Sequence, residues 1–365
     1  MNVVILGLSI TSSWGNSHAT TYRALARGLA SRGHAVTFFE RDAEWSAENR
    51  DLENPSYCRV KIYRDREQLE RLHSSEISKA DLVIIGSGVP DGIALGDVVL
   101  RAAGGCTAFY DIDTPVTLAG LQRGQVAYID RRQIPLFDLY LSFTGGPTLL
   151  RLERQFGAKR ARALYCSVDV ETYREDASIT RDCDLGYLGE YSEDRQSAVD
   201  SLLIEASRLW PEGRFLLAGA RYPATMVTPA NVTRVPHLAS TDFYNRQRFT
   251  LNLTPLDMIV AGYSPSVRLF AAAACGTPII SDDWPGLRGF FTPGREILIA
   301  KNSRDVLGYL RNLPETERAR IGACARRRVL SSHTASHRAT ELEQYVAQAA
   351  GGAHASLLQA MPRPA

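Results

Sequence analysis

Short apolar runs alternate with amphipathic stretches along the first 170 residues. "NVVILGL", which starts at Asn2, is a β-branched run ending in glycine, and "TTYRALARGLASRGH" (20–34) follows with apolar residues at helical spacing. "AVTFFERD" (35–42) is again typical of a strand. Further strand-like runs occur at 80–88, 104–113 and 137–146. This strand–helix–strand order predicts one doubly wound parallel α/β domain over residues 1–170.

The same alternation returns in the second half and predicts a second α/β domain over 171–330. Strand-like runs begin at 183, 213, 231 and 249, and "SAVDSLLIEASRLWP" (197–211) is amphipathic with helical spacing. A C-terminal helix is expected at 331–350, packed back on the first domain. The segment 351–365 is rich in Ala, Gly and Pro and is expected to be a flexible tail.

Composition narrows the class of protein. The 365 residues are 45% hydrophobic and 22% charged, as in globular proteins, and the net charge of +2 argues against a nucleic acid as partner. Six cysteines without a CxxC pair indicate neither a zinc site nor a disulfide framework. No run is long enough to span a membrane, and "MNVVILG" lacks the basic region of a signal peptide. We therefore expect a cytoplasmic enzyme or binding protein without a transmembrane segment.

The loop "GLSITSSWGNSHATT" (7–21) follows the first predicted strand, where ligands of parallel sheets bind. It lacks the GxGxxG spacing of a dinucleotide fingerprint. The small residues would let a ligand approach the backbone, and His18 could act as a base or as a hydrogen-bond donor. Alternatively, Ser17 or Thr20 caps the helix and His18 is merely exposed. The candidate substrate loop comprises Gly7, Ser13, Trp14, Gly15 and Asn16.

"FYDIDTPVT" (109–117) places Asp111 and Asp113 two residues apart at a strand end, which predicts that both project from the same face. Paired carboxylates can bind a metal, orient a sugar hydroxyl or take a proton. No third ligand at metal-binding spacing is evident. Alternatively, Asp113 caps a helix ahead of Pro115.

"SPSVRLFAAAACGTPIISDDWPG" (264–286) predicts a helix with Ser264 as its cap, Pro265 in its first turn and Gly276 just past its end. Arg268 would then lie where the helix dipole disfavours a cation, which indicates an anion nearby. Arg221, two residues after Gly219, is placed to meet a diphosphate. Arg195 lies in a charged loop that is equally typical of a solvated face.

The stretch from 262 to 300 resembles the C-terminal half of the glycosyltransferases named after the spore-maturation protein CgeB, relatives of the group 1, family 4 enzymes. "GLSITSSWGNSHATTYRAL" (7–25) and "FYDIDTPVTL" (109–118) resemble the N-terminal half, so the similarity covers about 1–340. The resemblance implies the GT-B fold, an α/β architecture of two Rossmann-like parallel-sheet domains facing a central cleft. It also implies a nucleotide-diphosphate sugar donor on the second domain, an acceptor on the first, and no obligatory metal or cofactor.

The resemblance assigns site residues as well. His18, Asp111 and Asp113 would lie beside the reacting sugar. The donor would contact Gly189, Arg221, Tyr263, Ser264, Ser266, Val267, Arg268 and Ala271.

One departure concerns two glutamates, eight residues apart, that group 1 enzymes usually carry. Their places fall at Tyr263 and Ala271 when "FAAAACGTP" is aligned with "FEAAACGTP". The second glutamate typically holds the ribose, and losing such a charged hydrogen bond costs about 1.5–3 kcal/mol.

These observations favour a glycosyltransferase that moves a sugar from a nucleotide diphosphate to an unknown acceptor, which could be a glycan, a protein or a small molecule. Family analogy favours retention at the anomeric carbon. The alternative is a catalytically silent sugar-nucleotide or glycan-binding protein, motivated by Ala271, whether that residue is natural or engineered. A Rossmann oxidoreductase is disfavoured because the glycine fingerprint and a ribose-binding acid are missing.

Overall fold

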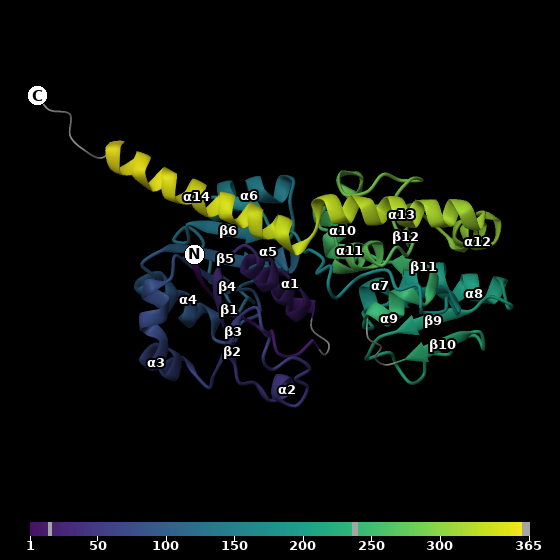
Figure 1. Ribbon diagram of the computed structural model, residues 1–365, viewed down its shortest axis with the longest axis horizontal. Coiled ribbons are helices and arrows are strands. Elements are labelled where there is room, and N and C mark those ends of the chain that lie inside the picture. Colours follow the sequence, from purple (N-terminus) through teal and green to yellow (C-terminus); the bar gives the residue numbers. More distant parts are fainter. Residues whose placement is uncertain (14–16, 236–239, 360–365) are drawn as a thin grey trace, which may run out of the picture. The chain divides into compact units, whose positions relative to one another are not determined.

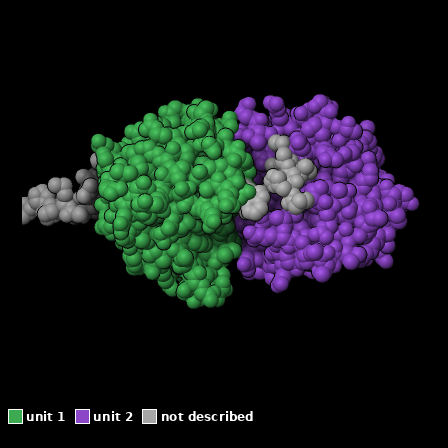
Figure 2. Space-filling view, turned by 90° about the horizontal axis from the view of Figure 1, so that it is seen from below, with its two compact units in different colours: residues 1–165, 335–365 green, residues 166–334 purple. Residues whose placement is uncertain are grey.

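The computed structural model describes residues 1–13, 17–235 and 240–359. The chain divides into two compact units, residues 1–165 with 335–365 (unit 1) and residues 166–334 (unit 2), coloured separately in Figure 2. Each unit is built around one fully parallel sheet covered by helices (Figure 1). The prediction of two doubly wound parallel-sheet domains is therefore confirmed.

Unit 1 contains a seven-stranded sheet in the order β3-β2-β1-β4-β5-β6-β7. All five residues of β4 are buried, which is typical of a parallel strand covered on both faces. The strands are β1 (Asn2–Gly7), β2 (Ala35–Arg41), β3 (Arg59–Tyr63), β4 (Leu82–Gly86), β5 (Cys106–Asp111), β6 (Leu139–Ser142) and β7 (Ala161–Ala163). The central position of β1 places the loop that follows it in the middle of the carboxyl edge, where ligands of such sheets bind.

Seven helices belong to the described part of unit 1: α1 (Ser17–Ser31), α2 (Glu44–Ala47), α3 (Arg66–Lys79), α4 (Gly92–Ala102), α5 (Thr114–Arg123), α6 (Pro147–Phe156) and α14 (Ala335–Gln359). The C-terminal helix α14 packs against α1: a Cβ on Gly28 would lie 2.4 Å from the Ala335 carbonyl oxygen. Arg32 and His34 both bind the Glu343 carboxylate, each at 2.6 Å. The helix α14 continues to Gln359, within the segment from 351 for which we expect a flexible tail, and that expectation stays a prediction.

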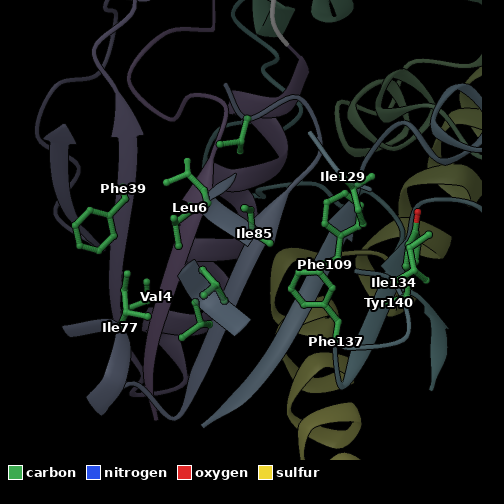
Figure 3. Close-up of a cluster of buried hydrophobic side chains, with 14 of the residues drawn as sticks. Val4, Leu6, Phe39, Ile77, Ile85, Phe109, Ile129, Ile134, Phe137 and Tyr140 are labelled. Carbon is green, nitrogen blue, oxygen red and sulfur yellow. The ribbon is translucent and has the colours of Figure 1, made fainter. Parts of the chain in front are cut away.

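The core of unit 1 is a continuous apolar cluster between the sheet and its helices (Figure 3). Leu6 and Ile85 come from the neighbouring central strands β1 and β4, and Phe109 and Tyr140 come from β5 and β6. The Phe109 and Tyr140 rings lie 5.3 Å apart. This packing fixes the strand ends, and with them the loops that carry the polar residues.

Unit 2 repeats the arrangement with a six-stranded sheet in the order β10-β9-β8-β11-β12-β13. Its strands are β8 (Cys183–Leu188), β9 (Phe215–Ala218), β10 (Val232–Val235), β11 (Gln247–Asn252), β12 (Ile279–Ser281) and β13 (Leu298–Ile299). Its helices are α7 (Glu193–Val199), the π-helical η1 (Asp200–Ile204), α8 (Glu205–Leu209), α9 (Ser240–Asn245), α10 (Leu256–Ala261), α11 (Val267–Ala274), the 3₁₀ turn η2 (Leu287–Gly289), α12 (Ser303–Asn312) and α13 (Glu315–Ser332). The first strand of the unit, β8, again lies inside the sheet.

The helix expected from Ser264 begins later, at Val267. Ser266 occupies the N-cap position with an extended backbone, φ −81° and ψ 150°. Because Ser266 is still extended, Pro265 lies before the helix and Ser264 does not cap it. Nor does the sequence analysis anticipate α10, which lies just before this helix.

Candidate functional site

A buried glutamate holds the loop after β1. Glu40 is the penultimate residue of β2, and its carboxylate accepts hydrogen bonds from Ser9 Oγ (3.1 Å), Ile10 N (2.7 Å), and Thr11 N and Oγ1 (3.0 and 2.7 Å). An acid at the end of the second strand of a Rossmann domain can bind a ribose. Here both oxygens are occupied by the chain itself, which further disfavours a dinucleotide-dependent oxidoreductase.

The remaining residues of the candidate substrate loop have structural partners or are not described. A Cβ on Gly7 would lie 2.2 Å from Phe38 Cζ, so this glycine makes room for a buried ring and not for a ligand. Ser13 binds Asp51 through its backbone N and its Oγ, at 3.0 and 2.6 Å. Trp14, Gly15 and Asn16 lie outside the described residues.

His18 pairs with Asp113 at the carboxyl edge of unit 1. His18 is the second residue of α1 and is buried, and its Nε2 lies 2.9 Å from Asp113 Oδ2. The alternative of a merely exposed histidine is therefore wrong. Ser87, directly after β4, donates to the same oxygen at 3.1 Å. Burial alone would raise the pKa of Asp113, but the hydrogen bonds from His18 and Ser87 outweigh it and hold that pKa below its usual range.

Asp111 lies in a different environment, although it is only two residues away. It ends β5, is fully buried, and accepts hydrogen bonds from Tyr140 OH at 2.6 Å and Thr117 Oγ1 at 2.7 Å. Burial raises the pKa of Asp111 to about 7, against these hydrogen bonds, which lower it. The prediction that both carboxylates share one face is wrong because the strand ends at Asp111. Asp113 follows in a turn, with φ −116° and ψ 34°, and its side chain does not cap α5.

In unit 2, the guanidinium of Arg268 lies at the carboxyl edge of the sheet. Arg268 is the second residue of α11; its Nε donates to the carbonyl oxygen of Leu188 at 2.8 Å and its Nη1 to Asn252 Oδ1 at 3.2 Å. Leu188 and Asn252 are the last residues of β8 and β11. These oxygens offset part of the unfavourable interaction between the cation and the helix dipole. The guanidinium also lies over the Tyr187 ring, 5.0 Å from its centroid.

Two glycines leave bare backbone beside this guanidinium. A Cβ on Gly189 would lie 3.1 Å from Arg268 Nη2 and 2.6 Å from the Tyr187 hydroxyl oxygen. Gly219 has a φ of +144°, and a Cβ there would lie 2.0 Å from the Gly189 carbonyl oxygen. Both positions are therefore tightly packed. Gly189 N donates to Ala218 O at 2.9 Å and its carbonyl accepts from Tyr222 OH at 3.1 Å, which leaves the Arg268 guanidinium as the group at this point that a ligand would meet.

The structure reverses the order in which the sequence ranks the other two arginines. The side chain of Arg195, in α7, is only 18% exposed. Its Nη1 and Nη2 donate to Tyr187 OH (3.3 Å) and to the Glu190 carbonyl oxygen (3.2 Å). Arg221 is 72% exposed and meets only the Glu190 carboxylate, at 3.6 Å. Arg195 therefore joins Arg268 at Tyr187. The one sequence signal for it is its place in the first turn of the helix after β8.

The segment around the start of α11 completes this edge. Ser266 Oγ donates to Asn252 Oδ1 at 2.9 Å, so it fixes Asn252 and does not cap the helix. Tyr263 is partly exposed and has a φ of +48°, whereas Ser264 is buried. Val267 is the first residue of α11, whose initial N–H groups have no carbonyl partner within the helix. Ala271 is buried on α11, so the methyl group does not face open solvent.

Asp282 follows β12 and is partly buried. Burial raises the pKa of Asp282, against hydrogen bonds from Thr254 N and Oγ1, both at 2.9 Å. The carboxyl edge of unit 1 thus carries a histidine–aspartate pair, and that of unit 2 carries two arginines together with Asp282.

Other possible binding features lie apart from these residues. Two surface cavities in the described part of unit 1, of about 660 and 630 Å³, are not lined by His18, Asp111 or Asp113. Over 1–13, 17–235 and 240–359, no group of three or more His, Cys, Asp or Glu side chains is arranged to hold a metal ion. Within the same ranges, none of the helices combines the length and hydropathy needed to cross a bilayer.

Comparison with known proteins supports the fold and points to one class of activity. Residues 195–344 match a family described as glycosyl transferase-like, and no curated protein matches the chain. Among solved structures, sucrose-phosphate synthase from Thermosynechococcus elongatus is 16% identical, with a TM-score of 0.66 over 96% of this chain and 100% of that one.

Two further solved structures are similar in fold and were determined with nucleotides. The Anabaena protein Alr3699/HepE, in complex with UDP and glucose, is 11% identical, with a TM-score of 0.69 over 95% of this chain and 100% of its own. An α-glucosyltransferase in complex with UDP-glucose and DNA containing an abasic site is 13% identical, with a TM-score of 0.70 over 95% and 99%. At these identities the likeness shows the fold, which is that of the GT-B glycosyltransferases.

Proposed function

We propose that this protein is a glycosyltransferase that moves a sugar from a nucleotide-diphosphate donor to an acceptor hydroxyl. The observation that carries the proposal is the position of Arg268, held by Leu188 O and Asn252 Oδ1 with its Nη2 beside the bare backbone of Gly189. A diphosphate is the anion that this arrangement fits, because a guanidinium pairs with phosphate oxygens through two parallel hydrogen bonds. The family match over residues 195–344 includes Arg195, Arg268 and α11.

The donor diphosphate would lie between Arg268, Arg195 and the N-terminal amides of α11. Helix N-termini bind phosphates through unpaired N–H groups and the helix dipole. During transfer, the acceptor oxygen bonds to the anomeric carbon, the bond from that carbon to the diphosphate oxygen breaks, and the acceptor's hydroxyl proton passes to the departing diphosphate. The diphosphate keeps the electron pair, and the two arginines stabilise its charge. We propose a metal-independent reaction because these cations supply the positive charge at the leaving group.

On unit 1, His18 and Asp113 are the groups that we propose for contact with a sugar or acceptor hydroxyl. Both hydrogen bonds to Asp113 go to Oδ2, so among the described residues Oδ1 has no partner. This oxygen can accept a hydrogen bond from a sugar or acceptor hydroxyl. Asp111 would be a positioning residue, because its carboxylate is buried. Retention at the anomeric carbon and membership of the CgeB-like group are proposed on the sequence resemblance alone. We also infer a cytoplasmic location.

The second candidate function is that of a silent nucleotide-sugar or glycan-binding protein. The observation in its favour is Ala271, which stands where the sequence resemblance expects the glutamate that holds the ribose. A methyl group accepts no hydrogen bond. If Ala271→Glu raises donor hydrolysis or transfer from an undetectable level, the natural chain is the silent protein. If the unaltered chain already hydrolyses or transfers, it is the enzyme.

Stabilisation by donors tests the binding step that both candidates share. We expect at least one UDP, GDP, dTDP or ADP sugar to raise the melting temperature, because a ligand that binds only the folded state stabilises it by mass action. UDP-glucose is the first probe. Arg268→Ala should abolish the shift, whereas Arg311→Ala, an exposed arginine in the last turn of α12, should keep it. If no nucleotide sugar changes the melting temperature, the donor site is not where we place it.

A further inference from the structure

Helix α10 exposes an apolar surface that the proposed donor site does not use. Its sequence is LDMIVA, and none of its six residues is buried. Leu256 is 56% exposed and Val260 is 79% exposed. A helix that is apolar on nearly all sides normally lies inside a protein. We call Leu256, Met258, Ile259 and Val260 the α10 patch.

Both ends of α10 join residues of the candidate donor site. Before it, β11 ends at Asn252, which accepts a hydrogen bond from Arg268. After it, Gly262 and Tyr263 both have positive φ, 65° and 48°, and lead to Ser266 at the start of α11. A positive φ is unfavourable for tyrosine and is found at sites where the surroundings enforce it.

The contacts of Tyr263 show what enforces this turn. Its N–H donates to the Pro285 carbonyl oxygen at 2.6 Å. A Cβ on Gly286 would lie 2.6 Å from Tyr263 Cδ1, so the ring lies directly against that glycine. At the other end of the helix, Leu256 N donates to Asp194 Oδ2 at 3.2 Å. The α10 patch is therefore held in place as a continuation of the donor site.

Size and charge identify the kind of molecule that fits the patch. Six residues span roughly 9 Å along a helix about 10 Å wide, a footprint of roughly 90 Å², far less than the ~800 Å² that each partner of a stable protein interface contributes. Asp257 is the only charged residue between Pro255 and Tyr263. Without a basic residue there, the patch lacks the cations that attract an anionic lipid surface. A small molecule with an uncharged apolar part fits both conditions.

We propose that the α10 patch binds the apolar part of the acceptor, so that the acceptor is an alcohol attached to an alkyl or aryl group. The proposal rests on the proposed function and specifies its acceptor class. The hydroxyl would lie toward the donor, and the apolar group would cover Leu256 and Val260. Burial of each CH₂ group contributes about 0.8 kcal/mol, so a long alkyl chain is a strong probe of the patch.

Two glycosides that differ only in their alkyl group test the proposal. The probes are n-octyl β-D-glucoside, below its critical micelle concentration, and methyl β-D-glucoside, each titrated with and without UDP. We expect the unaltered protein to bind the octyl glycoside at least tenfold more tightly than the methyl glycoside. Methyl NMR signals of Leu256, Ile259 and Val260 should shift with the octyl glycoside only.

A matched pair of variants locates the effect. Leu256→Ser/Val260→Ser should reduce the octyl preference to less than twofold. The control is Leu209→Ser/Val227→Ser, which removes the same residue types at similar exposure, 52% and 83%, elsewhere in unit 2. The control should keep the tenfold preference.

Three results would overturn the proposal. The first is equal affinity of the unaltered protein for the two glycosides. The second is an equal loss of the preference for the octyl glycoside in both double variants, which would indicate non-specific adsorption. The third is a dimer that becomes monomeric only in Leu256→Ser/Val260→Ser, because a second copy would then cover the patch. The thermal shift with UDP is measured on every variant. If UDP stabilises none of them, the proposed donor site is wrong. The ratio of the affinities for the two glycosides still tests the α10 patch in that case.

Discussion

The sheets of the two units place their strands in the same order, but the residues at their carboxyl edges differ in charge. β1 lies between β2 and β4, and β8 lies between β9 and β11. In unit 1 the strands lead into acids, Glu40, Asp111 and Asp113, whose partners are hydroxyls, amides and one histidine. In unit 2 they lead into two arginines, Arg195 and Arg268, and one acid, Asp282. Strand order therefore sets where a ligand can bind, and the residues after each strand set which chemical groups bind there.

Glycines at the strand ends differ between the units in the same way. In unit 1, Gly86 leaves room for a side chain, since a Cβ there would lie 1.7 Å from the Tyr22 hydroxyl oxygen. In unit 2, Gly219 leaves room for the backbone of Gly189. At Gly86 the space at the strand end is filled by the side chain of Tyr22. Gly219 brings two main-chain segments into close contact, where Gly189 N donates to Ala218 O at 2.9 Å.

The largest predicted effect concerns the unit 2 glycine. Gly219→Ala should lower the free energy of unfolding by about 3 kcal/mol, because the new Cβ meets backbone at a φ that disfavours alanine. Urea denaturation measures the change. Gly289→Ala is the control: no atom lies within 4 Å of its added Cβ, and we expect a loss below about 0.5 kcal/mol. Equal losses in the two variants would contradict the close packing of β8 and β9.

The second prediction concerns Asp111 and pH. The pKa of Asp111, raised to about 7 by burial, means that the folded protein keeps a proton that the unfolded chain loses above about pH 4. Stability therefore falls as pH rises from about 4 to 7, and the full loss is present above 7. Asn cannot ionise. Across this window the free energy of unfolding of Asp111→Asn should rise by roughly 1–3 kcal/mol relative to that of the unaltered protein.

The control for that prediction is Asp97, a carboxylate whose pKa is shifted in the opposite direction. Hydrogen bonding to Arg132 holds the pKa of Asp97 below its usual range, so its contribution is present at neutral pH and is lost as pH falls through that lowered pKa. Asp97→Asn should therefore be less stable than the unaltered protein at pH 7 and equally stable in strong acid. Urea denaturation at each pH measures both variants. A gain that does not change with pH in Asp111→Asn would show that Asp111 is ionised in the folded state.

The smallest predicted effect separates two arginines of unit 2. Arg221→Ala should weaken UDP binding less than threefold, because its side chain is 72% exposed and meets only Glu190. Arg195→Ala should weaken it at least tenfold, because that guanidinium is held at Tyr187. Isothermal titration measures both. The reverse order would restore the ranking made from the sequence.

The sequence predicts most of the fold because the pattern of apolar runs records which strands are buried. It also brings His18 and Arg268 to attention, since each is polar and lies next to a predicted strand end or helix start. It does not separate Asp111 from Asp113, because the alternation rule holds only within a strand and β5 ends at Asp111. The late start of α11 depends on the backbone of Ser266. The inward position of Arg195 depends on Tyr187 OH and the Glu190 carbonyl, contacts that no local pattern specifies.

The most direct test of the account compares UDP with UMP, which lacks the second phosphate. If the carboxyl edge of unit 2 binds a diphosphate through Arg268, the unaltered protein should bind UDP at least tenfold more tightly than UMP. Arg268→Ala should reduce that ratio to about one, and Arg311→Ala should leave it unchanged. If Arg268→Ala weakens both ligands equally, or if UDP and UMP bind the unaltered protein alike, the assignment of the diphosphate to Arg268 is wrong.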